Sequence, residues 1–318
     1  MQKLLDLLIR QSSVRTECQS LGQWLPAWHE QQMAHMKCGP FVAAVAAATR
    51  ADRLAWAFFS GYQGAIQSAF PQSAQAGQVS AFCVNEAGKK ISEIATSIKK
   101  IDGDFLMHGS KSWALADVDD MTLFVLARRS HGPAKGAGSL TVIQVPLQTA
   151  GVQRNPARAQ KVVPELPHAG INFDGVLLQD SQFMSGDGYA DYAKPFRARE
   201  DIFVTGCALA YLLSEAKAAA WPTTWSQRCI AALVALEQCS RQDLSNEQVH
   251  ILVAGVLSLA GGIIRESEQH WTVVQGLAQD RWQRDASLLT LGRDARRQRA
   301  IKSWAQTDWT VTSEVVSD

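Results

Sequence analysis

The sequence lacks an excess of charge of either sign. Its 31 lysine and arginine residues nearly balance its 30 aspartate and glutamate residues, so the net charge is +1. The basic residues are scattered and form no cluster that would attract phosphates. We therefore expect no binding to nucleic acid or to an anionic membrane surface.

Cysteine is scarce, and its spacing does not suit a metal ion. The six cysteines show no paired ligand spacing, and several lie in apolar segments with helix or strand character. This pattern predicts buried free thiols in a reducing compartment. The histidines near Cys38 match no known ligand pattern either, so no metal site is expected.

Long apolar runs are also absent. No uninterrupted run approaches the roughly 20 residues that span a bilayer, so no membrane helix is expected. The first ten residues carry charges within their apolar run and no small-residue cleavage site, which argues against a signal peptide. We expect a cytoplasmic protein.

What the sequence does contain is three successive regions of different periodicity. Residues 1–76 have helical periodicity, with apolar stripes in the first ten residues and over 41–70. Residues 77–190 hold short alternating segments separated by turn signals such as Asp102-Gly103, which predict antiparallel strands. A glycine-rich segment at 132–139 is predicted to be a hairpin loop, because it lacks the sequence that completes a phosphate-binding loop. Residues 191–318 predict four amphipathic helices with short connections, at 198–220, 223–242, 246–271 and 279–306.

The middle region contains segments that resemble the acyl-CoA dehydrogenase family. Ala81-Phe-Cys-Val-Asn-Glu86 is similar to a family strand and turn that reads Tyr-Cys-Val-Thr-Glu-Pro-Gly. Residues 102–113, Asp-Gly-Asp-Phe-Leu-Met-His-Gly-Ser-Lys-Ser-Trp, resemble the signature Asp-Gly-Asp followed by Gly-x-Lys-x-Trp. Residues 173–176 and 186–188 resemble the closing strand and its turn. The resemblance therefore spans the whole middle region.

The resemblance implies the family's α+β multidomain fold. It implies a shortened N-terminal helical domain (1–76), a central antiparallel β-domain (77–190) and a C-terminal four-helix bundle (191–318). Family members are dimers or tetramers, so we expect a homo-oligomer, or attachment to a partner subunit, through the bundle. Six tryptophans are too many large rings for a small bundle to hide: Trp221, Trp225, Trp271, Trp282, Trp304 and Trp309.

The resemblance also implies that FAD binds on the β-domain, against Phe82, Val84, Asn85, Trp113 and Leu115. Trp113 keeps the place of the tryptophan that flanks the flavin ring in the family. Asn85 and Leu115 replace hydroxyl residues, and only Asn85 can still hydrogen-bond a flavin edge. For Phe82 and Trp113, a role in the β-core is an open alternative.

Three elements that grip the cofactor in the family are altered. The glycine-rich loop after the first strand is reduced to Ala87-Gly-Lys-Lys90, and the Arg-x-x-Phe-Gly element is replaced by residues 218–224. The later glycine-rich loop is missing between Trp271 and Arg284. We therefore expect FAD to bind weakly or to be lost on purification.

The implied activity is oxidation of the CH–CH group of an acyl-CoA or acyl-carrier thioester, for which a carboxylate must remove a proton. The family's usual glutamate is absent from 289–294. Some members place the base on the first bundle helix, where this chain reads Arg199-Glu200, so Glu200 is the candidate base. The alternative for Glu200 is a carboxylate near a helix N-terminus, favoured by the helix dipole.

Two other functions stay open. The chain is then either a cofactor-poor, non-catalytic subunit or scaffold of a dehydrogenase, or a module that binds an acyl chain or its carrier protein. Flavin binding separates both from the enzyme.

Overall fold

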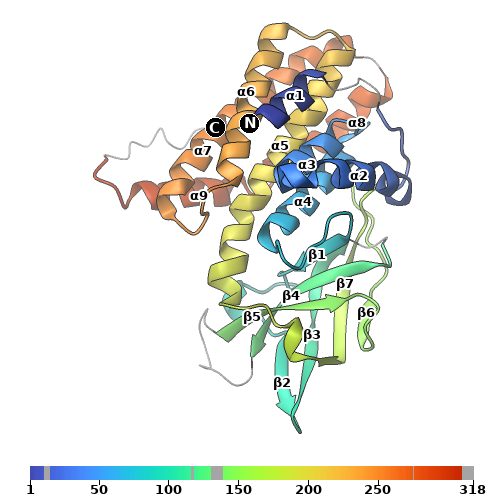
Figure 1. The fold of residues 1–318 in the computed structure, drawn as a ribbon, viewed down its shortest axis with the longest axis vertical. Coiled ribbons are helices and arrows are strands. Elements are labelled where there is room, and N and C mark those ends of the chain that lie inside the picture. Colours follow the sequence, from blue (N-terminus) through green and yellow to red (C-terminus); the bar gives the residue numbers. More distant parts are fainter. Residues whose placement is uncertain (11–14, 116–117, 130–138, 275, 310–318) are drawn as a thin grey trace. The chain divides into compact units, whose positions relative to one another are not determined.

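The computed structural model describes residues 1–10, 15–115, 118–129, 139–274 and 276–309, which form two compact units (Figure 1). Unit 1 combines Met1–Ser68 with Ala198–Asp318, and unit 2 is Ala69–Arg197. The helices before and after the strands therefore belong to one unit. The three-domain division at 76/77 and 190/191 stays a prediction. The predicted hairpin loop at 132–138 lies outside the described residues.

The first part of unit 1 contains α1 (Gln2–Arg10), α2 (Leu21–His35), α3 (Pro40–Ala48) and α4 (Leu54–Ala69). The prediction of one helix over 41–70 is wrong, because the chain leaves the helical path between α3 and α4. At the break, the Thr49 hydroxyl donates to the Ala46 carbonyl (2.8 Å), and the Arg50 carbonyl accepts from the N–H of Thr16 (2.8 Å). A partner far along the chain thus takes a carbonyl that the continued helix would have used.

The second part of unit 1 contains α5 (Lys194–Ala218), α6 (Thr223–Ser240), α7 (Glu247–Ser267), α8 (Leu277–Asp285) and α9 (Arg293–Trp304). The predicted fourth helix over 279–306 is wrong as a continuous element. The chain turns at Gly292, whose φ of 76° is left-handed and does not fit a helix interior. Asn246 caps α7 by accepting from the N–H of Gln248. Short helical turns lie at Met36–Cys38, Ile91–Glu93, Asp180–Gln182, Gly188–Ala193, Glu268–Val273 and Ala286–Thr290.

Unit 1 has a core rich in aromatic rings. Trp24 and Trp56 stack with centroids 6.0 Å apart, and Trp271 stacks on Trp282 at 5.5 Å. The expectation that the tryptophans of the last region cannot be hidden is wrong for four of them, because they pack against one another and against Tyr211. The buried rings are Trp221, Trp225, Trp271 and Trp282.

Within the described residues, one helical stretch, Glu247–Thr272, is long and apolar enough to cross a membrane by length and composition. This stretch begins with α7, which packs against α6 and α9 in unit 1. A helix in a bundle meets the same criteria, since its inner face is apolar. Glycine, serine and histidine interrupt the apolar run of this stretch, and the expectation of no membrane helix stays a prediction.

The strands of the described chain form one mixed sheet in unit 2 (Figure 1). The strands are β1 (Val79–Cys83), β2 (Ser97–Ile101), β3 (Asp104–Leu115), β4 (Met121–Arg129), β5 (Leu140–Pro146), β6 (Val152–Arg154) and β7 (His168–Leu178). They are ordered β1-β4-β2-β3-β7-β6, with β5 also paired to β4. The prediction of an antiparallel sheet is wrong for two pairs, because β1 and β2 both run parallel to β4. Parallel strands are joined by long connections. The prediction relied on turn signals between consecutive segments, and such signals cannot indicate a pairing of this kind.

The two parallel pairings determine the path of the chain between β1 and β2. β1 pairs with Met121–Val125 and β2 with Arg128–Arg129, while β5 lies along the other edge of β4. β1 and β2 therefore follow one another along the same edge of β4. The connection over residues 84–96 leaves this edge and returns to it. We call this connection the 84–96 loop.

Candidate functional site

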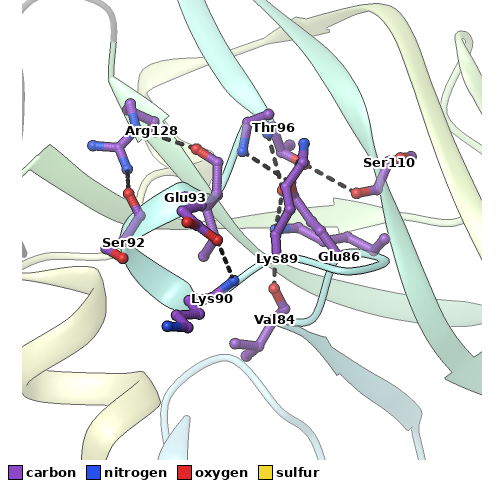
Figure 2. A network of polar contacts seen from close by, with 12 residues as sticks. Val84, Glu86, Lys89, Lys90, Ser92, Glu93, Thr96, Ser110 and Arg128 are labelled. Carbon is purple, nitrogen blue, oxygen red and sulfur yellow. Dashed lines mark hydrogen bonds and ion pairs between the residues drawn. The ribbon is translucent and has the colours of Figure 1, made fainter.

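The 84–96 loop is held by the buried carboxylate of Glu86 (Figure 2). One Glu86 oxygen, Oε1, accepts from the N–H and the hydroxyl of Thr96 (2.9 and 2.6 Å) and from Lys111 Nζ (3.0 Å). The other, Oε2, accepts from the N–H of Ala95 (2.8 Å) and from Lys89 Nζ (3.2 Å). The carboxylate thus joins both ends of the loop to β3, which carries Lys111.

These contacts keep Glu86 ionised although it is buried. Burial by itself raises the pKa of Glu86, but the hydrogen bonds from Thr96 and Ala95 and the charge of Lys111 outweigh it and lower the pKa to about 2. Burial lowers the pKa of Lys111, while the nearby Glu86 carboxylate acts in the opposite direction. The ion pair therefore depends on both partners being present.

The glycine of the Gly-x-Lys-x-Trp segment makes this arrangement possible. Gly109 has a φ of 142°, and a Cβ at this position would lie 2.5 Å from the Cα of Thr96. No side chain fits at that distance, so only glycine lets β3 approach the end of the loop. Thr96 can then reach both Glu86 and the Ser110 carbonyl, which accepts from the Thr96 hydroxyl (3.2 Å).

The same network positions the predicted cofactor-contacting residues at the start of the loop. Lys111 Nζ donates to the carbonyl of Val84 (3.2 Å), and the N–H of Ser112 donates to the carbonyl of Asn85 (2.9 Å). The second bond holds Asn85 next to the residue that precedes Trp113. The structure therefore brings Asn85 and Trp113 together across the end of β1 and the end of β3.

The five predicted residues differ in accessibility. Trp113 is 47% exposed and Asn85 is exposed, whereas Val84 is half-buried. Phe82 and Leu115 are buried, and Phe82 packs edge-on against Phe70 with centroids 5.2 Å apart. Of the two residues for which a core role was open, Phe82 is in the core and Trp113 is exposed; Leu115 is buried as well, and Asn85 is accessible.

Two residues that the sequence did not single out flank Trp113. The Arg158 guanidinium lies 5.8 Å from the centroid of the Trp113 ring, and the His168 ring meets it edge-on at 6.0 Å. The N–H of Arg158 donates to the His168 carbonyl (2.8 Å), and Gln160 Nε2 lies 2.8 Å from His168 Nδ1. Burial lowers the pKa of His168, which favours its neutral form. We call Asn85, Trp113, Arg158 and His168 the Trp113 surface.

The candidate base lies in unit 1, on α5. Because α5 begins at Lys194, Glu200 is its seventh residue and lies beyond the first turn, where the helix dipole acts most strongly. The alternative role for Glu200 therefore loses its physical basis. The next residue, Asp201, is bound by two arginines of α9, with Arg296 Nη1 3.0 Å from Oδ1 and Arg299 Nη2 on Oδ2.

The missed residues were not marked in the sequence. Glu86 and Lys111 lie in the two family-like segments, 81–86 and 102–113, but their neighbours in sequence are exposed or half-buried, so no local pattern marked them as a buried pair. Arg158 and His168 had no local signal, because they reach Trp113 only through the long-range pairing of β3 with β7.

No model of a known protein family matches the chain. Benzylmalonyl-CoA dehydrogenase from Aromatoleum aromaticum is 28% identical over 130 residues, which is 39% of this chain and 33% of that protein. The match thus spans about a third of that relative's length. Dibenzothiophene monooxygenase (TdsC) from Paenibacillus sp. A11-2 matches 99% of this chain and 97% of its own, with a TM-score of 0.66 and 14% identity. Butyryl-CoA dehydrogenase from Megasphaera elsdenii matches 96% and 94%, with a TM-score of 0.65 and 12% identity.

The chain has the acyl-CoA dehydrogenase fold, and part of it is similar in sequence to one dehydrogenase. Other structures with this fold are of TdsC bound to FMN and of PigA with FAD and proline. The exposed indole of Trp113 offers a flat apolar face, and the exposed Asn85 amide can donate or accept a hydrogen bond. Leu115 is buried and offers no donor. The Trp113 surface therefore suits a planar ring with polar edges, although it has one hydrogen-bonding group fewer than the family pattern.

Proposed function

We propose that this protein binds a flavin at the Trp113 surface and acts as an acyl-CoA dehydrogenase-type oxidoreductase on the CH–CH group of an acyl thioester. The observation that carries the proposal is the exposed Trp113 ring, held next to the exposed Asn85 by the bond between Ser112 and Asn85. The dehydrogenase name of the curated relative supports the thioester as substrate class.

Each residue has a defined role in this proposal. Trp113 stacks on the ring, and the Asn85 side chain hydrogen-bonds a ring edge. The Val84 carbonyl accepts from Lys111, and the Val84 side chain offers an apolar contact. A bound flavin, with FAD the expected form, would supply the acceptor for the electron pair that leaves the substrate. Glu200 is the proposed base for the proton alpha to the thioester carbonyl.

Isothermal titration calorimetry with FAD and with FMN tests flavin binding. We expect weak binding that Trp113→Ala lowers about tenfold, since a stacked aromatic pair contributes on the order of 1 kcal/mol beyond its buried area. Trp113→Phe should retain much of the affinity. Trp309→Ala is the matched control, because Trp309 is also exposed but belongs to unit 1. Equal binding by the wild type and Trp113→Ala would exclude this surface.

A Glu200→Gln variant tests the catalytic part of the proposal. The substitution keeps the shape of the side chain but removes the basic oxygen. We expect loss of turnover with a range of acyl-CoA substrates, while the circular dichroism and the flavin content stay unchanged. Full activity in the variant would exclude Glu200 as the base.

A second candidate function, a non-catalytic subunit or scaffold of a dehydrogenase, is favoured by the burial of Leu115 where the family has a hydrogen-bond donor to the ring. It predicts a colourless protein that does not respond to added FAD or FMN. The calorimetric titration therefore distinguishes the two functions before any substrate is tried.

A further inference from the structure

Helix α5 carries two fully buried polar side chains on one face inside unit 1. Tyr211 and Glu215 are four residues apart, which places them on the same side of the helix, and both are 0% exposed. Neither the Tyr211 hydroxyl nor either Glu215 carboxylate oxygen has a hydrogen-bond partner within the described part of the chain. Because a buried polar group without a partner destabilises the folded state, such a group indicates a bound water or ion.

Charged side chains from three other segments of unit 1 meet at this face. Arg15 Nη1, from the connection before α2, lies 3.0 Å from Glu215 Oε1. Burial raises the pKa of the Tyr211 hydroxyl, which is also subject to the charges of Glu215, Arg15, Asp52 and Arg281. The hydroxyl therefore lies where these charged groups come together. We call Arg15, Asp52, Arg53, Tyr211, Glu215 and Arg281 the Tyr211 cluster.

Positive charge exceeds negative charge in the Tyr211 cluster. Asp52 is shared by two arginines, since its Oδ2 accepts from Arg53 Nη2 (2.8 Å) and from Arg281 Nη1 (2.9 Å). Arg15 faces Glu215, whose pKa is raised by burial to about 7, so that near neutral pH its carboxyl is protonated in part of the molecules. Three guanidinium groups thus face at most two carboxylates. An excess of buried charge is costly unless an opposite charge compensates it.

We propose that the Tyr211 cluster holds one small monovalent anion, of the size of chloride, inside unit 1. The Tyr211 hydroxyl supplies a hydrogen-bond donor, and Arg15 and Arg281 supply the positive charge. Trp271 lies beside Tyr211, with ring centroids 6.4 Å apart, and its buried Nε1 also has no partner among the described residues, so it supplies a second donor. A cation is disfavoured by the same excess of positive charge. A monatomic anion needs the space of only one atom among these packed side chains.

Glu215 makes this binding depend on pH. Its ionised carboxylate repels an anion, whereas its protonated carboxyl offers an O–H donor. Anion binding therefore favours the protonated form and takes up as much as one proton. By linkage, the affinity for the anion should increase as the pH falls through 7. Asp52 does not oppose this change, because its charge is already balanced by Arg53 and Arg281.

Thermal unfolding of the full chain in sodium chloride and in sodium gluconate tests the site. The salts are compared at equal ionic strength, so that general screening is the same, and gluconate is too large for a site of one atom. We expect a higher midpoint in chloride, with an increment that saturates and is larger at pH 6 than at pH 8. Equal midpoints at both pH values, or an increment that grows with pH, would overturn the proposal.

Tyr211→Phe distinguishes a bound anion from a bound water. The substitution removes the hydroxyl but keeps a ring to pack against Trp282. We expect an apparent chloride affinity about tenfold lower, as for the loss of a hydrogen bond to a charged group. An equal loss of stability in both salts would assign the hydroxyl to a water, and a gain in both would leave it without a partner, so either result would overturn the anion site. Tyr192→Phe is the matched control, because the Tyr192 hydroxyl donates to the Ser185 carbonyl in unit 2 (2.8 Å).

Glu215→Gln tests the link to the proton. The amide cannot ionise and keeps a donor, so chloride should raise the midpoint of this variant equally at pH 6 and pH 8. A pH dependence as large as that of the wild type would overturn the role of Glu215. Broadening of the chloride-35 NMR line by the wild-type protein needs no variant. It should be stronger at pH 6 than at pH 8, and its absence at pH 6 would exclude the site.

Discussion

Lys111 Nζ lies 3.0 Å from Oε1 of Glu86, and both side chains are buried in unit 2. The pair connects the loop after β1 to the middle of β3, two residues before Trp113. This ion pair therefore links the two family-like segments, 81–86 and 102–113. It holds the part of β3 that carries the exposed Trp113.

Lys111→Met should destabilise the protein by about 3–5 kcal/mol, because it leaves the Glu86 carboxylate buried without its cation. Lys89→Met is the matched control. Lys89 Nζ lies 3.2 Å from the same carboxylate, but its side chain is 40% exposed, so its loss should cost less than about 1 kcal/mol. Urea unfolding followed by circular dichroism measures both. Equal losses in the free energy of unfolding for the two substitutions would mean that the buried ion pair stabilises the protein no more than the exposed one.

Acid should weaken the protein through Glu86. Its pKa is lowered from 4.5 to about 2 in the folded state, so its stabilisation is present above about pH 4.5 and is lost as the pH falls towards 2. The shift corresponds to roughly 3 kcal/mol. Glu86→Gln, measured by urea unfolding between these pH values, should be less stable at neutral pH and show a flatter pH dependence. An unchanged slope would assign acid sensitivity to other carboxylates.

Glu215 should act in the opposite direction. It is buried on α5, and burial raises its pKa from 4.5 to about 7, although Arg15 Nη1 lies 3.0 Å from Oε1. The folded state then holds the proton more tightly than the unfolded state, so this residue reduces stability as the pH rises from about 4.5 to 7. Glu215→Gln should remove that decline, which corresponds to roughly 3 kcal/mol. Thermal unfolding at several pH values would show it, and an unaltered decline would contradict it.

Arg158→Ala should weaken flavin binding about two- to fivefold, because an exposed cation–π contact contributes about 0.5–1 kcal/mol to holding the indole in place. Arg129→Ala is the control, since Arg129 lies 5.4 Å from the centroid of Phe183 and not at the Trp113 surface. Calorimetric titration with FAD measures the change. Tighter binding in Arg158→Ala would mean that the guanidinium competes with the flavin for the ring.

The sequence predicted well where structure follows from local segments. The 102–113 segment indicated the turn and the strand that carry Trp113, and helical periodicity located α5, α6 and α7 to within a few residues. It failed where distant residues decide. The break after α3 depends on Thr16, and the parallel position of β1 depends on β4.

In the candidate site, too, residues in local segments were predicted and residues brought in by distant pairing were not. Asn85 and Trp113 follow from family-like segments, whereas Arg158 reaches Trp113 through the β3–β7 pairing. Helix α2 was missed because Pro26 and several polar residues interrupt a helical pattern that in fact buries Trp24 and Trp28. The tryptophans were predicted to be exposed from their number alone, and number does not show which rings can stack on each other.

The discontinuous composition of unit 1 determines the order in which the chain can fold during its synthesis. Helices α1 to α4 leave the ribosome first, but their partners α5 to α9 follow only after all of unit 2. The bond from the Ser214 hydroxyl to the Thr49 carbonyl spans 165 positions of sequence. Unit 2 is contiguous and can complete its own sheet earlier, so the first helices must wait with apolar faces uncovered. Pulse-labelled hydrogen exchange during refolding should therefore protect amides of β3 and β4 before those of α3.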